Sequence, residues 1–258
     1  MEQVLIEVGS REVAKLLQGT DTGRAFNSLR CSTLMALGFG NCPSLFEFSG
    51  VALKMESLRE FGTRSVYGRA MKVEKWKSIE SLKGIRLEDW VEMSSGLIMP
   101  NSHLRELSIH VQNDMDDEMV SKGRASLQKM TNLVKLHLKL YYRPETMLKL
   151  IPNLESLTSL KMDGHGFSLE CSAAVAFPPN LSHLTLTGMK DLSMEELGKL
   201  PKLQYLTLRH LYVSEDVGRM KILHDGFPCL KALSLKDIFE LRESAQTRHH
   251  IICITCRL

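Results

Sequence analysis

The sequence contains little that would point to a membrane-spanning, disulfide-stabilised or nucleic-acid-binding protein. No stretch approaches the ~18 consecutive apolar residues that a transmembrane helix needs, and aromatic residues make up only 6% of the chain. Six cysteines in 258 residues are too few for a disulfide framework. Lys and Arg number 33 against 30 Asp and Glu, an excess too small to predict nucleic-acid binding. An acid, Glu2, stands where a secretory signal carries positive charge, so we expect a cytoplasmic protein with no membrane span.

Motifs for nucleotide binding and for hydrolysis are also absent. A phosphate-binding loop needs Gly-x-x-x-x-Gly-Lys-Ser/Thr, so that backbone N–H groups surround the phosphates. The string that comes nearest, Gly19–Arg24, is too short and lacks the lysine. Neither a Gly-x-Ser-x-Gly elbow nor a His-Glu-x-x-His zinc motif occurs. We therefore expect no catalytic residues, no enzymatic activity and no cofactor.

The C-terminal tail holds the one group of residues with metal-ligand chemistry. His249 and His250 precede Cys253 and Cys256, and Cys-x-x-Cys is a usual zinc spacing. The histidines stand only three and four residues from Cys253, with no loop that would let four ligands converge. We therefore expect no metal site, and favour an unstructured terminus with incidental Cys and His.

An internal repeat dominates the rest of the chain. It has six clear copies and three weaker ones, which begin at Leu34, Leu58 and Leu82, so there are about nine candidate repeats. The six clear copies start 29, 24, 24, 22 and 27 residues apart, and leucine-rich repeats run ~20–29 residues. The shared spacing is apolar-x-x-apolar-x-apolar, found at Leu104-Leu107-Ile109, Leu133-Leu136-Leu138, Leu157-Leu160-Met162, Leu181-Leu184-Leu186, Leu203-Leu206-Leu208 and Leu230-Leu233-Leu235; the weaker copies are Leu34-Leu37-Phe39, Leu58-Phe61 and Leu82-Ile85-Leu87.

This spacing predicts an α/β leucine-rich-repeat solenoid. The last two apolar residues of each copy are two apart, so in a strand both point to one face, which stacking of successive units buries. We expect a curved parallel sheet on the concave side, with short helices and loops on the convex side. A helical bundle or coiled coil also repeats leucine, but it needs a sustained 3.5–3.6 period, which proline would break. The predicted organisation is an irregular segment 1–30, a solenoid over 31–239 and an atypical or disordered tail over 240–258.

Prolines and one capping motif support the repeat boundaries. Pro152, Pro179, Pro201 and Pro228 stand shortly before strands, where their fixed φ and missing N–H end any convex helix. Between two of the strands, Ser193 is followed three residues later by Glu196, which predicts a capping box at a helix start.

The residues between the strand leucines are predicted to line the concave face and to contact a protein partner. Five are Lys or Arg and two are acids, so the predicted face has a net positive formal charge. We predict Tyr205 and Arg209 as interface anchors, since Tyr and Arg dominate binding hot spots. The alternative is that these residues are polar only because they are exposed to solvent, and that they bind no partner. The predicted binding residues are Glu106, His110, Lys135, His137, Lys139, Lys161, Asp163, His183, Tyr205, Thr207, Arg209 and Lys236, with Ser108, Ser159, Thr185, Thr187, Ala232 and Ser234 completing the face.

The repeats from about Ile79 to Phe239 resemble those of plant intracellular immune receptors, the coiled-coil nucleotide-binding leucine-rich-repeat class. The resemblance rests on the order of particular strings along the chain. These are Ser81-Leu82-Lys83-Gly84-Ile85-Arg86-Leu87, Leu104-Arg105-Glu106-Leu107 followed by Ile109, Phe177-Pro178-Pro179-Asn180-Leu181, Leu184-Thr185-Leu186, Leu197-Gly198-Lys199-Leu200-Pro201-Lys202-Leu203 and Gly226-Phe227-Pro228-Cys229-Leu230-Lys231.

This resemblance implies a role in defence, in which the repeats sense a pathogen effector or a host protein, or bind the nucleotide-binding domain of a related receptor. The coiled-coil and nucleotide-binding domains of that class are absent here, so we expect a fragment or truncated product. Two other classes stay open. A substrate-recognition adaptor of an F-box-type ubiquitin ligase predicts an N-terminal helical F-box, which residues 1–50 lack. An extracellular receptor predicts a signal peptide and paired capping cysteines, which are also lacking.

Overall fold

The structure is a computed structural model, and it divides into two compact units. One unit comprises Met1–His110 with Lys129–Leu133, and the other comprises Val111–Gln128 with Val134–Leu258. The residues that the structure describes are 5–8, 35–39, 57–63, 78–96, 103–112, 115–141, 151, 154–168, 177–190, 192–214, 226–242, 245–250 and 254–257.

The first unit contains a parallel sheet whose strands follow one another in chain order. Each strand pairs with the next one along the chain. The helix α3 follows directly on the fourth strand and buries Leu87 and Trp90 completely. The elements are β1 (Leu5–Val8), β2 (Ala36–Phe39), β3 (Glu60–Thr63), β4 (Ser81–Arg86), α3 (Leu87–Gly96) and β5 (Glu106–Val111).

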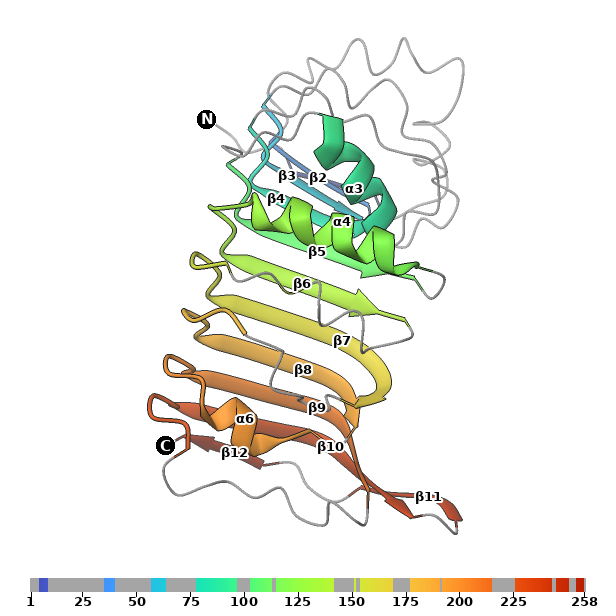
Figure 1. The fold of residues 1–258 in the computed structure, drawn as a ribbon, viewed down its shortest axis with the longest axis vertical. Coiled ribbons are helices and arrows are strands. Elements are labelled where there is room, and N and C mark those ends of the chain that lie inside the picture. The colour runs from blue at the N-terminus through green and yellow to red at the C-terminus, as the bar shows by residue number, and fades with distance from the viewer. Residues whose placement is uncertain are drawn as a thin grey trace. The chain divides into compact units, whose positions relative to one another are not determined.

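The second unit has the same kind of architecture, and its parallel strands lie side by side in chain order (Figure 1). Strands β6 to β10 pair in parallel, whereas β11 and β12 both pair antiparallel with β10. The elements are α4 (Asp117–Gln128), β6 (Lys135–Leu140), β7 (Ser159–Ser168), β8 (His183–Lys190), α6 (Met194–Gly198), β9 (Tyr205–Ser214), β10 (Ala232–Arg242), β11 (Ala245–His250) and β12 (Ile254–Arg257).

The predicted apolar positions form continuous rows across the second unit. The first leucine of each strand is paired in register with that of its neighbour, and so is the second apolar residue. These side chains are at most 1% exposed from β6 to β9, and each such burial stabilises the fold by about 1.5–3 kcal/mol. The rows are Leu136, Leu160, Leu184, Leu206 and Leu233, and Leu138, Met162, Leu186, Leu208 and Leu235. The predicted solenoid core is thereby confirmed.

A tight turn precedes the strands of the second unit. The backbone N–H of Leu157 donates to the Leu154 carbonyl, that of Leu181 to Pro178, and that of Leu230 to Phe227. Pro179 and Pro228 therefore occupy the second position of such turns, which favours proline because the required φ is near −60°. The prolines thus shape the turn itself, rather than only ending a preceding helix.

The short helix α6 begins as predicted, at Ser193. The Ser193 hydroxyl accepts a hydrogen bond from the backbone N–H of Glu196 at 3.4 Å. The Glu196 carboxylate does not complete the predicted capping box. It instead accepts from Lys199 Nζ at 2.5 Å, at the other end of the helix. A single side-chain bond therefore caps this helix.

The repeat around β4 differs in register from the prediction. Leu82 is paired with Leu107 and Ile85 with Ile109, with a bulge between Lys83 and Ile85. Leu82 therefore takes the second apolar position of its repeat and not the first. Gly84, with φ of 79°, supplies the left-handed backbone that the bulge requires. The apolar triplet predicted from Leu82 to Leu87 is thus wrong in phase.

Strands also lie outside the predicted solenoid limits. Nothing in the leucine pattern predicted β1, which pairs in parallel with β2. The segment predicted to be an atypical or disordered tail contains β11 and β12. Cys253 lies outside the described residues, and among those described no three His, Cys, Asp or Glu side chains are placed to hold a metal. Within the same residues, no helix has the length and apolar character to cross a membrane.

Candidate protein-binding face

The predicted binding residues of the second unit occupy one face of strands β6 to β10, in three rows across the sheet. We call this set of residues the polar face. Register places side chains at equivalent positions next to one another on neighbouring strands, ~4.8 Å apart. The first row is Lys135, Ser159, His183, Tyr205 and Ala232; the second is His137, Lys161, Thr185, Thr207 and Ser234; the third is Lys139, Asp163, Thr187, Arg209 and Lys236.

The one acid of the polar face, Asp163, is enclosed by donors. Its Oδ2 atom lies 2.7 Å from His137 Nε2 and 3.0 Å from Lys161 Nζ. Burial raises the pKa of Asp163, but hydrogen bonds from His137, Lys161 and Thr187 lower it by more, so the pKa falls well below its usual value. The Asp163 carboxylate therefore stays ionised, and its charge is compensated within the face.

An aromatic pair stands in the first row. The rings of His183 and Tyr205 are stacked, with centroids 4.5 Å apart and an interplanar angle of 18°. The Ser182 hydroxyl lies 2.9 Å from His183 Nδ1 and holds that ring in place. Burial, and then the nearby charge of Lys135, lower the pKa of His183, which favours its neutral form. Tyr205 is 39% exposed, so part of the pair's surface is open to solvent.

The strands of the second unit bend at a corner just after the third row. Gly188, His210 and Asp237 follow directly on the third-row residues of β8, β9 and β10, and all three have positive φ, of 75°, 50° and 55°. His210 Nδ1 lies 3.7 Å from Asp237 Oδ2. A left-handed residue at this position costs little for glycine and is tolerated by His and Asp. The corner therefore recurs in three successive repeats.

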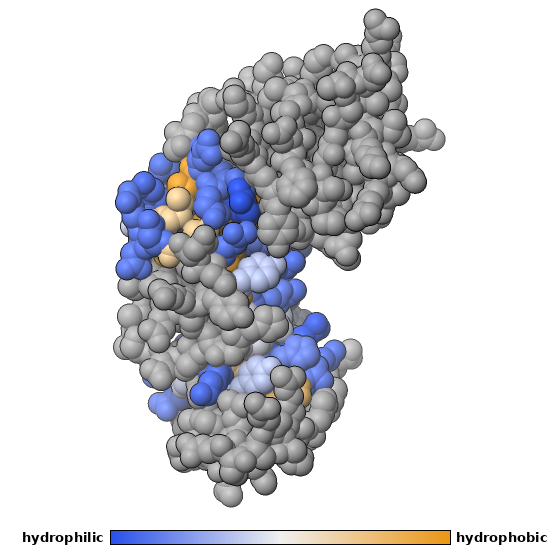
Figure 2. All heavy atoms as spheres, turned by 90° about the vertical axis from the view of Figure 1, so that its right-hand side faces the viewer, coloured by the Kyte–Doolittle hydropathy of each residue, from blue (hydrophilic) through white to orange (hydrophobic). Residues whose placement is uncertain are grey.

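Aromatic side chains gather beyond this corner. Tyr212 and Phe239 are paired in register, and their ring centroids lie 5.6 Å apart. The His210 ring lies 6.3 Å from that of Phe239 and nearly parallel to it. Figure 2, which views the molecule along its strands, shows mostly hydrophilic described side chains, with apolar colour confined to small areas. The described residues on this side of the molecule are thus mostly polar, and the second unit has two local aromatic groups.

Comparison with known proteins identifies the family. A family model described as a leucine-rich repeat region matches residues 28–246. The chain belongs to this family. The crystal structure of InlP from Listeria monocytogenes is similar to it over 93% of this chain and 68% of that one, with a TM-score of 0.47 and 14% sequence identity. No curated protein sequence matches the chain. Leucine-rich-repeat regions are in general non-catalytic protein-interaction domains.

Ten of the twelve predicted binding residues of this leucine-rich-repeat region come together in the polar face. The other two lie in the first unit. Glu106 accepts a hydrogen bond from Ser81 Oγ at 3.1 Å and pairs with Lys83 Nζ at 3.0 Å. His110 is only 7% exposed, so the expectation that it is accessible on the face is wrong. Side chains alternate between the two faces of a strand, so the sequence predicts which face a residue occupies. It does not predict whether other residues cover that face.

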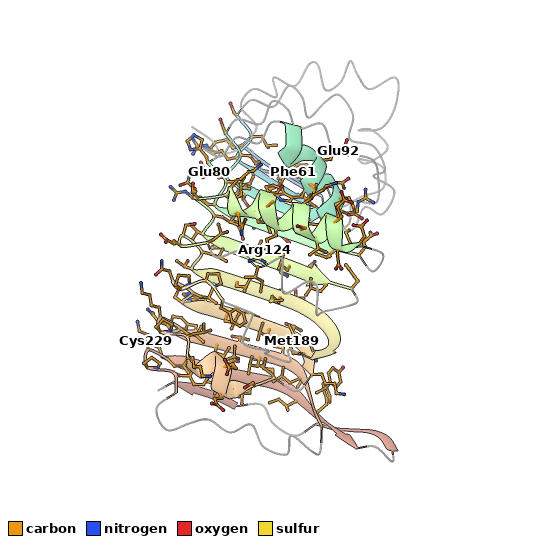
Figure 3. All side chains as sticks on the ribbon, viewed as in Figure 1. Phe61, Glu80, Glu92, Arg124, Met189 and Cys229 are labelled. Carbon is orange, nitrogen blue, oxygen red and sulfur yellow. The ribbon has the colours of Figure 1, made fainter. Side chains whose placement is uncertain are left out.

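The aromatic group beyond the corner was not predicted. Its members, His210, Tyr212 and Phe239, follow the last strand leucine, where the repeat template ends. A signal was present, because Tyr212 stands four residues after Leu208 and Phe239 four residues after Leu235. A template extended by four residues would have found the pair. Figure 3 labels Met189, a fully buried residue of β8 that follows directly on the corner glycine Gly188.

Proposed function

We propose that this leucine-rich-repeat region binds a protein partner through the polar face, as the sensing part of a plant intracellular immune receptor that acts in the cytoplasm. The observation that supports partner binding is the register of β6 to β10, which fixes exposed Tyr205, Arg209 and Lys135 on one rigid sheet. Side chains on paired strands lose little freedom on binding, and preorganisation of this kind strengthens affinity.

The plant-receptor part of the proposal rests on the order of repeat strings from Ile79 to Phe239. Several of these strings correspond to structural features. Phe227-Pro228-Cys229-Leu230 forms the turn before β10, and Leu197 to Leu203 forms the end of α6 and the entry to β9. A sensing role requires such a rigid framework with variable side chains between the leucines. The partner is then an effector, a host protein or a nucleotide-binding domain.

A pull-down from plant extract tests the binding face. The intact chain is compared with Tyr205→Ala, Arg209→Ala and a control, Arg124→Ala. Arg124 is exposed on helix α4, outside the polar face (Figure 3). We expect each face variant to weaken capture of the partner about tenfold or more, as for a hot-spot residue. Unchanged capture by both face variants would remove them as anchors.

A second experiment tests the receptor role separately. The chain is co-expressed in leaf tissue with the nucleotide-binding domain of a coiled-coil-type immune receptor and then precipitated. Co-precipitation of the two, with a change in defence-associated cell death, is expected. If the precipitate instead contains ubiquitin-ligase scaffold subunits and no receptor domain, the adaptor function is favoured and the immune role is lost, while protein recognition stands.

A further inference from the structure

The charge on the polar face is one-sided. Five of its residues are Lys or Arg, and Asp163 is its one acid, already bound by His137 and Lys161. Among the residues that the structure describes, no carboxylate lies within ion-pair distance of the other cations, Lys135, Lys139, Arg209 and Lys236. The chain as a whole has an excess of only three positive charges. The positive potential is therefore a local property of this face.

The free cations and the aromatic pair have a fixed relative placement. Arg209 and Lys236 are paired in register on β9 and β10, so their Cα atoms are ~5 Å apart. Tyr205 stands four residues before Arg209 on the same strand, ~13 Å away at 3.3 Å per residue. Thr207 lies between them with its neutral hydroxyl. The face thus offers a cationic end, a hydrogen-bonding centre and a flat aromatic end.

We propose that the polar face binds an acidic protein segment, with carboxylates beside Arg209 and Lys236 and an apolar side chain on the Tyr205–His183 rings. This inference rests on the proposed partner binding and names the chemistry of that partner. Charge complementarity carries it, because an acidic segment is drawn to this face, whereas the rest of the chain is nearly neutral, with 28 of the 33 Lys and Arg against 29 of the 30 Asp and Glu. The rings, ~13 Å from the cations, fit a side chain four residues away in an extended segment.

A protein segment fits this face better than a nucleic acid does. Phosphate backbones favour proteins with continuous basic stripes and a strongly basic domain. Here hydroxyls form most of the second row, and in the third row Asp163 and Thr187 separate Lys139 from the adjacent cations Arg209 and Lys236. The His183 and Tyr205 rings stack on one another, so their facing surfaces are covered and only the outer ring faces and edges are left for an apolar group.

The test is selection from a random twelve-residue peptide library displayed on phage, with the full chain as bait. We expect recovered peptides to be enriched in Asp and Glu over Lys and Arg, with an aromatic or aliphatic residue at a fixed offset. A labelled recovered peptide is then titrated. R209Q/K236Q should weaken its binding about tenfold, and rising salt should weaken the wild-type complex. The matched control K122Q/R124Q removes the same charge from α4 and should leave binding unchanged.

The outcomes separate the two proposals. Peptides without acidic enrichment that still lose binding in Tyr205→Ala would overturn the acidic partner and leave the binding face in place. Peptides that bind all variants equally, or no recovered peptides, would overturn both. A single-stranded oligonucleotide of equal charge serves as competitor. If it binds more tightly than the acidic peptide, the face recognises nucleic acid and the inference fails.

Discussion

Replacement of Leu206 by alanine tests the energetic basis of the fold. Leu206 is 1% exposed in β9 and is paired in register with Leu184 on one side and Leu233 on the other. Removal of a buried leucine side chain costs the lost transfer free energy together with that of the cavity, about 2–5 kcal/mol in protein cores. Because both neighbouring strands limit collapse around the site, we expect a loss of about 3 kcal/mol.

The control for this variant is Leu235→Ala. Leu235 occupies the second apolar row in β10 and is only half-buried, so we expect a loss of about 1 kcal/mol. Urea denaturation followed by far-UV circular dichroism gives both free energies of unfolding. Equal losses for Leu206→Ala and Leu235→Ala would show that the loss of stability does not depend on how completely each leucine is buried.

Three further predictions concern single side chains. The pKa of Asp163 is lower in the folded than in the unfolded chain, so its contribution to stability is present above about pH 4 and is lost as pH falls. In D163N this acid-dependent loss of the free energy of unfolding should shrink. An unchanged dependence of that free energy on pH would contradict the hydrogen bonds to Asp163. Ser193→Ala should lower the free energy of unfolding by about 0.5–1 kcal/mol, measured by urea denaturation, because the α6 cap is lost. Lys135→Ala should raise the pKa of His183 in an NMR titration, since the lysine charge opposes protonation; no change would remove that coupling.

The rows of the sheet could be predicted from sequence because stacking imposes register. Leu160, Leu184 and Leu206 must face the same side and lie opposite one another if each strand is to bury its apolar face. The polar residues between them then share the other face, which is how Tyr205 and Arg209 were placed correctly. The spacing of the leucines thus predicts both which residues form the core and which positions are exposed.

Features that depend on backbone conformation could not be predicted from spacing. The bulge at Gly84 adds one residue to β4. The apolar-x-x-apolar-x-apolar spacing therefore matches the sequence best when it starts at Leu82, three residues after the position that the structure gives to the first apolar residue of this repeat. Positive φ at His210 and Asp237 produces the corner that brings Tyr212 beside Phe239. The spacing of apolar residues along the sequence does not indicate where the backbone adopts a positive φ.

The C-terminal tail shows how antiparallel pairing can replace a repeat. An unpaired edge strand leaves backbone N–H and C=O groups exposed and invites association. Here β12 pairs with β10, with Cys256 opposite Leu233 and Ile254 opposite Leu235. The register therefore sets a residue of apolar type opposite each leucine, on a strand that runs in the reverse direction. The six-residue template cannot match a reversed strand, but the period-2 alternation Ile254-Thr255-Cys256 satisfies the same requirement that one face be apolar.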